Sequence, residues 1–283
     1  MATALGAHLL GLTDTLRFEP VTRRVRARHG DVVVLDSTDA VLVWEPRRVV
    51  PMYAVPPADL AADLTVCEPA PVPPNLPPIL GPVNFAWHHT PGTSYDLSLG
   101  DRTWPATAFA PDDPDLGGRV VVEWAPFDWV EEALSVTGHP HDPFKRIDLL
   151  PSDRHVVVRL GGTVLADTRR AIALHETHLP VRWYVPHDDV RIDLFVGSRS
   201  TSTCAYKGQA SYVSLSSHGV DATGVTGSDG ADVAWTYPHP LSEVAVVKGM
   251  FCFYAERTDL ALDGVAQARP TTPWASPRDQ ERF

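Results

Sequence analysis

Short apolar runs rich in β-branched residues, separated by polar turns, recur along the chain and predict β-strands. Residues 156–160 form one such run, a Gly-Gly pair at 161–162 supplies a two-residue turn, and residues 163–166 resume the pattern, which is typical of a hairpin. Further strands are predicted at 171–175, 181–185, 212–215, 234–237, 250–254 and 259–262. Two short stretches, 186–194 and 241–247, favour helices. The pattern therefore predicts a mainly β fold.

Residues 24–64 resemble residues 155–194, which indicates an internal repeat. Turn-forming, small and polar residues recur at matched places: Gly30 with Gly161, Asp36 with Asp167, Ala40 with Ala171, Glu45 with Glu176 and Tyr53 with Tyr184. One extra residue in the first copy then brings Pro56 onto Pro186. A period of this length predicts two tandem copies of one domain, not a solenoid.

The repeat sets the expected domain boundaries. The first copy covers residues 15–137, a bridge follows at 138–151, and the second copy covers residues 152–265. A proline-rich insertion at 68–82 is confined to the first copy and predicts an extended surface connector, because proline interrupts helices and central strands. We expect the polar tail at 266–283 to be disordered, and the two copies to pair with each other within the chain.

The composition limits the classes of partner. The chain has 283 residues, a formal net charge of -11 and 44% hydrophobic residues, which fits a globular protein and disfavours nucleic acid as a partner. No apolar run approaches the roughly 20 residues of a membrane span, and the first residues lack the basic start of a signal peptide. We therefore expect a cytoplasmic protein without membrane contact. Three cysteines without a C-x-x-C pair disfavour a disulfide framework and a four-cysteine zinc site.

Six motifs stand out: L-A-D-T-R-R-A at 165–171, H-E-T-H-L-P-V-R-W-Y-V-P at 175–186, T-C-A-Y-K-G-Q-A-S-Y at 203–212, W-T-Y-P-H-P at 235–240, K-G-M-F-C-F-Y at 248–254 and H-P-H-D-P-F-K-R at 139–146. Together they resemble a bacterial family known as domain of unknown function 427, sometimes labelled nucleotidyltransferase-like. The resemblance covers most of residues 15–265 and is stronger in the second copy. It implies two tandem β-tent, or Mss4-like, domains, each a strongly bent antiparallel sheet with two short helices. It supplies no reaction.

The segment T-C-A-Y-K-G at 203–208 concentrates chemically reactive groups. Cys204 offers a thiol and Lys207 an ammonium group, and a cation near a thiol raises its thiolate fraction. With Glu176 on a neighbouring predicted strand, we expect a pocket in which Lys207 holds an anion or a carbonyl, Glu176 acts as acid or base and Cys204 is a nucleophile. The same residues also allow a structural ion pair between Lys207 and Glu176, with Cys204 as a small buried residue.

Aromatic residues and one arginine are further candidates for ligand contacts. Most of the aromatic residues lie in predicted strands, where they are expected to form core. Trp235 and Tyr237 share a face of one predicted strand, and together with Tyr184, Tyr206 and Arg169 they are expected to contact the ligand.

The first copy provides a comparison for this candidate site. A loose alignment places Thr93 where the second copy has Cys204, and Asp96 where it has Lys207. The first copy would therefore lack the thiol and the ammonium group, so any active site belongs to the second copy.

Metal and phosphoryl-transfer chemistry have little support in the sequence. His139, His141 and Asp142 are close enough to suggest metal ligands, but a proline-spaced connector is the simpler interpretation, and no metal or other cofactor is expected. There is no phosphate-binding loop and no paired acidic motif for nucleotidyl transfer.

Three functional hypotheses remain. The first is an enzyme that acts on a small polar or anionic metabolite, with Lys207 as its anchor and no metal. The second is a non-catalytic module that binds a small molecule. The third is a scaffold in which the pocket is closed by side chains and the two copies form a pseudo-dimer.

Overall fold

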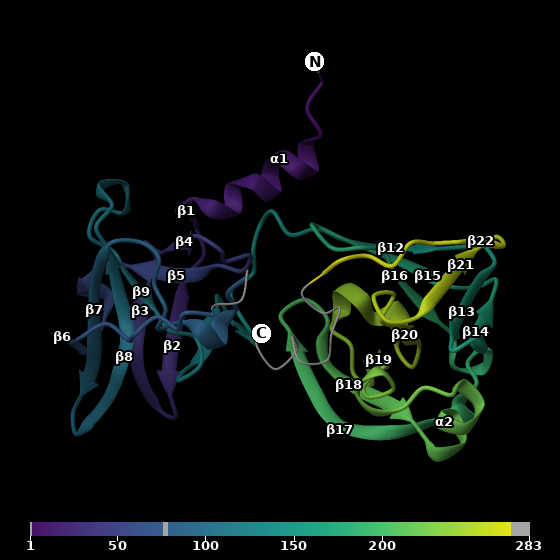
Figure 1. Ribbon diagram of the computed structural model, residues 1–283. Helices are drawn as coiled ribbons and strands as arrows, with labels where there is room; N and C mark the ends of the chain where they lie inside the picture. The colour runs from purple at the N-terminus through teal and green to yellow at the C-terminus, as the bar shows by residue number, and fades with distance from the viewer. Residues whose placement is uncertain (1, 76–78, 273–283) are drawn as a thin grey trace. The chain divides into compact units, whose positions relative to one another are not determined.

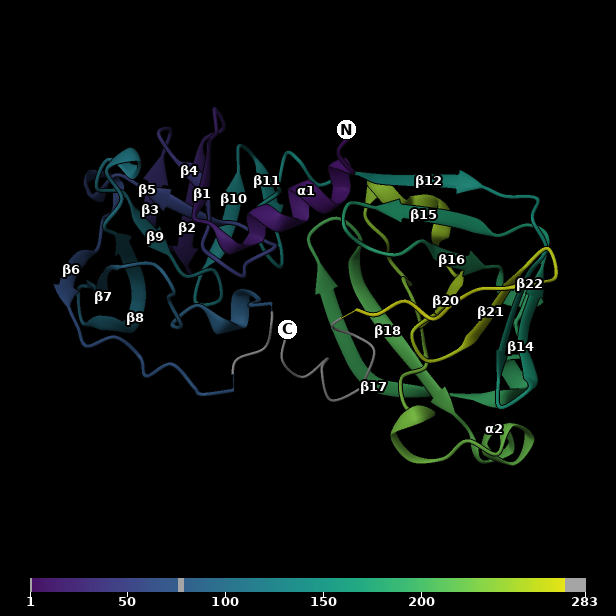
Figure 2. The same cartoon turned by 45° about the horizontal axis from the view of Figure 1, so that its top comes forward.

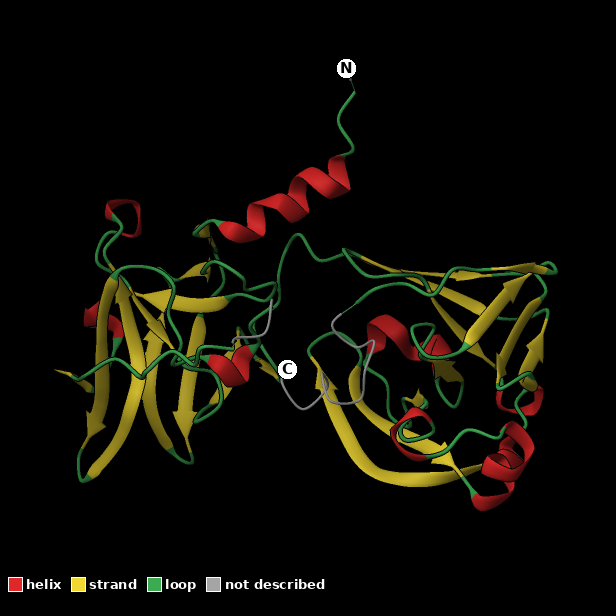
Figure 3. Cartoon of the chain, in the orientation of Figure 1, coloured by secondary structure: helices red, strands yellow, loops and turns green. Residues whose placement is uncertain are grey.

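The computed structural model describes residues 2–75 and 79–272 and divides into two compact units between Asp142 and Pro143 (Figure 1). In each unit the strands form one seven-stranded and one four-stranded sheet, and every strand pairing within them is antiparallel. Helical segments are short and few beside the strands (Figure 3). The prediction of a mainly β protein built from bent antiparallel sheets is confirmed.

The first unit begins with a short helix, α1 (Leu5–Gly11), before its sheets. Its strands are β1 (Arg17–Pro20), β2 (Val25–His29), β3 (Val32–Ser37), β4 (Val41–Trp44), β5 (Met52–Val55), β6 (Asp63–Val66), β7 (Gly92–Leu99), β8 (Arg102–Pro111), β9 (Val120–Val122), β10 (Asp128–Glu131) and β11 (Leu134–Val136). The larger sheet has the order β1-β4-β5-β9-β8-β7-β6 and the smaller sheet β11-β10-β2-β3. Short 3-10 helices interrupt the connections at Leu12–Asp14, Pro57–Asp59, Pro82–Asn84 and Pro114–Leu116.

The second unit repeats this plan. Its strands are β12 (Ile147–Pro151), β13 (Val156–Leu160), β14 (Thr163–Thr168), β15 (Ile172–Glu176), β16 (Arg182–Val185), β17 (Phe195–Cys204), β18 (Gly208–Leu215), β19 (Ala234–Thr236), β20 (Phe251–Phe253), β21 (Asp259–Leu262) and β22 (Val265–Ala266). The sheet orders are β12-β15-β16-β20-β19-β18-β17 and β14-β13-β21-β22. Adding eleven to each strand number of the first unit gives the second, so the repeat inferred from sequence is one repeated topology.

Strand register corrects one residue match of that repeat. Ile172 lies opposite Tyr184, and Val41, its counterpart, lies opposite Ala54. Tyr184 therefore corresponds to Ala54, while Tyr53 corresponds to the residue before Tyr184. The extra residue of the first copy precedes Tyr53, and a shift of one position on a strand moves a side chain to the opposite face of the sheet.

The connection between β17 and β18 corrects a second match. Cys204 ends β17 and pairs with Gly208, so residues 204–208 form the turn of a long hairpin. Gly208 has a φ of +90°, a conformation that glycine adopts without strain. In the first unit the equivalent connection runs from Cys67 to the start of β7. Thr93 lies inside β7 and is not the counterpart of Cys204.

The helices differ from expectation for local reasons. The predicted helix at 186–194 is replaced by two 3-10 turns, His187–Asp189 and Ile192–Leu194, because Val190 between them is extended and bridges to Ala166. The stretch at 241–247 forms a 3-10 helix, Ser242–Val247, and another 3-10 turn spans Gly227–Asp229. Helix α2 (Ser217–Thr223) was not predicted.

Three predicted segments can be followed in part. Within the proline-rich insertion at 68–82, residues 76–78 lie outside the described residues, and residues 68–75 form no helix or strand. The last five residues of the expected bridge at 138–151 form β12, which lies beside β15 (Figure 2). Of the tail, residues 273–283 lie outside the described part, whereas Arg269 pairs with Asp259 at 2.7 Å.

Candidate functional site

Lys207 and Glu176, predicted to lie together, form a buried ion pair in the second unit. Lys207 is in the β17–β18 turn, and its Nζ donates to Glu176 Oε2, at the end of β15, over 2.6 Å. A second ammonium group, from Lys145, lies 3.2 Å from Glu176 Oε1. Both carboxylate oxygens of Glu176 are thus occupied by lysine side chains.

The electrostatics favour the charged forms of Glu176 and Lys207. Burial by itself would raise the pKa of Glu176, but Lys207 and Lys145 outweigh burial and hold the pKa below its usual value. Burial by itself would lower the pKa of Lys207, but Cys204 and Glu176 outweigh it and raise the pKa. An ionised carboxylate with two ammonium partners is poorly suited to release or accept a proton near neutral pH.

The half-buried thiol of Cys204 lies near the Lys207 ammonium group and, with Glu176, raises the pKa of that lysine. The chain has only three lysines, and two of them, Lys207 and Lys145, meet at Glu176. Two positive charges against one carboxylate leave a formal charge of about +1 beside the thiol. The turn therefore combines a thiol with a local excess of positive charge.

The aromatic candidates lie mostly in the core. The side chains of Tyr184, Trp235 and Tyr237 are buried in one apolar cluster, where Trp235 Nε1 donates to the Tyr184 hydroxyl over 3.2 Å. Burial raises the pKa of Tyr184 well above its ordinary value. Tyr206 is half-buried in the β17–β18 turn, and Arg169 is exposed in the β14–β15 turn.

The first unit has a related pair, which the sequence alignment did not reveal. Glu45, the counterpart of Glu176, is buried, and its Oε2 accepts a hydrogen bond from His88 Nδ1 at 3.0 Å. Arg48 Nε lies 3.3 Å from the same oxygen. His88 belongs to the β6–β7 connection, the equivalent of the turn that carries Lys207. In both units, a side chain with a nitrogen donor, Lys207 or His88, comes from the equivalent connection and contacts the equivalent buried glutamate.

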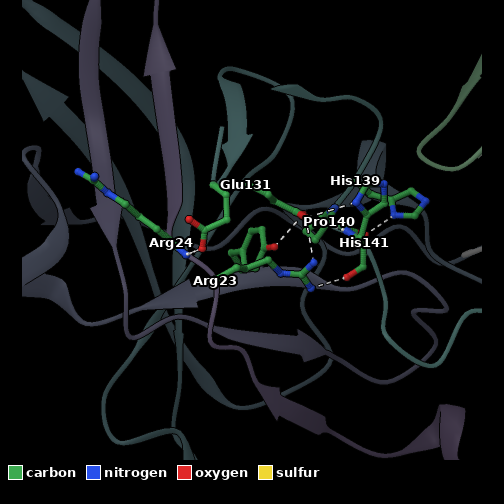
Figure 4. A network of polar contacts seen from close by, with 8 residues as sticks. Arg23, Arg24, Glu131, His139, Pro140 and His141 are labelled. Carbon is green, nitrogen blue, oxygen red and sulfur yellow. Dashed lines mark hydrogen bonds and ion pairs between the residues drawn. The ribbon is translucent and has the colours of Figure 1, made fainter. Parts of the chain in front are cut away.

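The histidines of the bridge take part in a hydrogen-bond network of the first unit (Figure 4). The buried Glu131 carboxylate accepts from the His141 backbone N–H at 3.2 Å, from Arg23 at 2.9 Å and from the Tyr53 hydroxyl at 2.8 Å. Burial alone would raise the pKa of Glu131, but these partners hold it below its usual value. Among residues 2–75 and 79–272, no three His, Cys, Asp or Glu side chains are grouped to hold a metal.

An open cleft of about 560 Å³ lies in the second unit, at a place that the sequence analysis did not propose. Its lining includes Leu150, Arg154, His175, Trp183, Leu260 and Gln267. The guanidinium carbon of Arg154 lies 6.0 Å from the centroid of the Trp183 ring. The cleft thus joins an aromatic wall to a cation.

Strand alternation separates this cleft from the lysine pair. On β15, Leu174 and Glu176 face one side of the sheet, so Ala173 and His175, which alternate with them, face the other. Both Ala173 and His175 line the cleft. The alternation of side chains between the two faces of β15 could be predicted from the sequence. Which of the two faces remains uncovered depends on the residues that pack over it.

Each unit is a small, mainly β domain of one seven-stranded and one four-stranded sheet, and the second unit also has the cleft and the buried ion pair. The family model described as domain of unknown function (DUF427) matches residues 17–71 and 148–264, more than half of the chain. The chain therefore belongs to this family. No curated protein matches it. Within the part of the chain that the structure describes, no helix combines the length and apolar character needed to cross a membrane.

Proposed function

We propose that the second unit is a small-molecule-binding domain whose ligand occupies the cleft beside Trp183. One observation carries this proposal: at three matched positions the first unit has Trp124, Trp129 and Glu131, and the second has the smaller or uncharged Ala255, Leu260 and Leu262.

Strand register establishes which residues correspond. Val25 lies opposite Glu131 on β10, and Val156 lies opposite Leu262 on β21, so Leu262 takes the place of Glu131. By the same pairing, Ala27 lies opposite Trp129, and Val158 lies opposite Leu260. Two large or charged residues of the first unit are therefore leucines in the second.

The next strand pair adds a third difference. Ala54 lies opposite Val121, and its counterpart Tyr184 lies opposite Cys252, so Cys252 corresponds to Val121. Three residues further along in each unit, Ala255 therefore corresponds to Trp124. In the first unit, the rings of Trp124 and Trp129 stack with centroids 4.8 Å apart and planes within 5°. In the second unit, alanine and leucine stand at these two positions, and both line the cleft.

The size and lining of the cleft suit a small molecule. Ligand sites commonly enclose about 300–1,000 Å³ and combine apolar walls with a few polar groups. Here the apolar wall includes Trp183, Leu150 and Leu260, and Arg154, His175 and Gln267 supply the polar groups.

The test is to fill the cleft with the side chain of the first unit. A panel of small metabolites is screened by ligand-observed NMR against the full chain and against Ala255→Trp. We expect compounds that bind the native chain and lose binding to Ala255→Trp. Val196→Trp, at an exposed position of β17, is the matched control and should retain binding. Equal binding to the native chain and to Ala255→Trp, or no bound compound at all, would overturn the proposal.

A second candidate function rests on the excess positive charge beside Cys204. In this alternative the second unit is an enzyme that acts, without a metal, on a small polar or anionic metabolite. Lys207 would hold the anion, Cys204 would be the nucleophile, and Glu176 would position the two lysines. All three cysteines of the chain are free, which supports a proposed cytoplasmic location.

Cysteine alkylation tests this second candidate. Iodoacetamide labelling of the native chain is followed by peptide mass spectrometry as a function of pH. Cys204 should react fastest, Lys207→Met should slow it, and Lys207→Arg should restore the rate. Cys252 is the internal control, because complete burial raises its pKa to about 12. A Cys204 rate that is unchanged by Lys207→Met would exclude the activated thiol.

A further inference from the structure

We propose that the ligand of the cleft is a flat aromatic molecule carrying one carboxylate. This inference rests on the proposed binding function and names the chemistry of the ligand. The first unit is its template, because there the protein's own side chains fill the corresponding space.

The aromatic part follows from what packs on Tyr53. Tyr53 and Trp183 occupy the same position on β5 and β16, as the register shows. In the first unit, the Trp129 ring stacks on Tyr53 with centroids 5.8 Å apart and planes at 29°. In the second unit, Leu260 stands in place of Trp129. A flat ring bound against Trp183 would restore the missing stacked partner.

The carboxylate follows from what pairs with Arg23. Arg23 stands two residues before Val25, as Arg154 stands two residues before Val156, so the two arginines correspond. Arg23 Nη1 donates to the Glu131 carboxylate over 2.9 Å (Figure 4). Leu262 replaces that acid in the second unit. The guanidinium that lines the cleft thus lacks the internal carboxylate of its counterpart.

Arg154 is held in place but keeps donors for a ligand. Its Nε donates to Asp263 at 2.7 Å, and among the described residues none accepts a hydrogen bond from either Nη atom. Carboxylates bind the paired N–H groups of arginine well. Because Asp263 already balances part of this charge and Asp153 also lines the cleft, one carboxylate fits better than a phosphate.

Three probes separate the two parts of the proposal. Indole-3-acetate has both the ring and the carboxylate, indole-3-acetamide lacks the charge, and cyclohexylacetate lacks the aromatic ring. Binding to the full chain is measured by ligand-observed NMR titration. We expect indole-3-acetate to bind at least about tenfold more tightly than either analogue, as a charged hydrogen bond or a lost stacking contact predicts.

Variants assign the discrimination to residues. Arg154→Gln should abolish the preference for the acid over the amide, and Trp183→Leu should abolish the preference for the aromatic ring. Arg159→Gln, at an exposed position on β13, is the matched control and should change neither. Ala255→Trp should prevent binding of all three probes.

The outcomes also separate this inference from the function on which it rests. If the amide binds as tightly as the acid, or if Arg154→Gln leaves the preference intact, the ligand class is wrong. If none of the probes binds but the metabolite panel yields a ligand that Ala255→Trp excludes, only the ligand class fails. If neither the probes nor the panel bind, both proposals fail.

Discussion

Trp183 and Tyr53 occupy the same position in the two units, yet their surroundings differ. Tyr53 is completely buried beneath Trp129 and donates its hydroxyl hydrogen to Glu131. Trp183 is half-buried and lines an open cleft. The difference arises from neighbouring strands, where Trp129 and Glu131 of one unit are replaced by Leu260 and Leu262 of the other.

Leu262→Glu should rebuild the arginine–carboxylate pair of the first unit. The new carboxylate would compete for Arg154, so affinity for indole-3-acetate should fall by roughly tenfold or more. NMR titration measures the effect. Leu262→Gln has the same shape without the charge and should weaken binding much less. Equal losses in both variants would show that shape alone is responsible.

Trp129→Ala should destabilise the first unit by about 3–5 kcal/mol, as is usual when a buried tryptophan is truncated. Trp129 is 2% exposed, stacks between Tyr53 and Trp124, and donates from its indole nitrogen to the Trp124 carbonyl. Hydrogen exchange of the β10 amides measures the change, while exchange in the second unit serves as the internal reference. Leu260→Ala, at the matched position, should cost less because Leu260 is only partly buried.

Lys207→Met should destabilise the second unit by about 3 kcal/mol, because it removes the more deeply buried of the two lysine partners of the Glu176 carboxylate. Lys145→Met should cost under about 1 kcal/mol, since Lys145 is closer to solvent. Hydrogen exchange of the β15 amides compares the two variants. Similar losses would mean that burial does not distinguish the lysines.

The same pair predicts how stability depends on pH. The folded pKa of Glu176 is lowered from 4.5, so its contribution is present above pH 4.5 and is lost as the pH falls through the lowered value. The folded pKa of Lys207 is raised from 10.5, so its contribution is present below pH 10.5 and is lost as the pH rises through the raised value. Exchange of the β15 amides, measured across pH, should show a loss of stability at acid pH and another at alkaline pH. Glu176→Gln should remove the loss at acid pH.

Arg182→Met should destabilise the second unit by about 3–5 kcal/mol, because it leaves a buried carboxylate without its cation. Arg182 makes two hydrogen bonds of 2.7 Å to Glu256, whose side chain is 0% exposed. Replacing both residues, with Arg182→Met and Glu256→Leu, should recover much of the loss. Urea unfolding followed by exchange in β16 tests this, and a double variant as unstable as the single one would contradict it.

The sequence predicted the strands and their repetition because alternation, turn glycines and β-branched runs are local signals. Strand β21 was predicted at its observed limits, and so was β13. Strand β17, rich in serine and threonine, was missed because its residues are largely exposed and give no apolar pattern. Helix α2 was missed although Ser216 caps its start and Gly224 its end, because it is only seven residues long.

The sequence also predicted that Lys207 and Glu176 lie together, although it expected neighbouring strands and the sheet places β16, β20 and β19 between β15 and β18. It could not show that Lys145 completes the pair, because Lys145 lies in a connector without a periodic pattern, which gives no indication of where its side chain points. Nor could it identify the cleft. Trp183 was one of many strand aromatics expected in the core, and only register matched it with Tyr53.

By itself, then, the sequence determined two copies of a mainly β domain and the chemistry of one buried cluster. Periodicity and repetition are properties of the amino-acid sequence and can be recognised without a tertiary structure. The tertiary structure alone decided which face of the sheet stays open. An empty volume arises from the sizes of side chains on β16, on β21 and in the β20–β21 connection taken together. Their alignment depends on strand register, where a shift of one residue exchanges the faces.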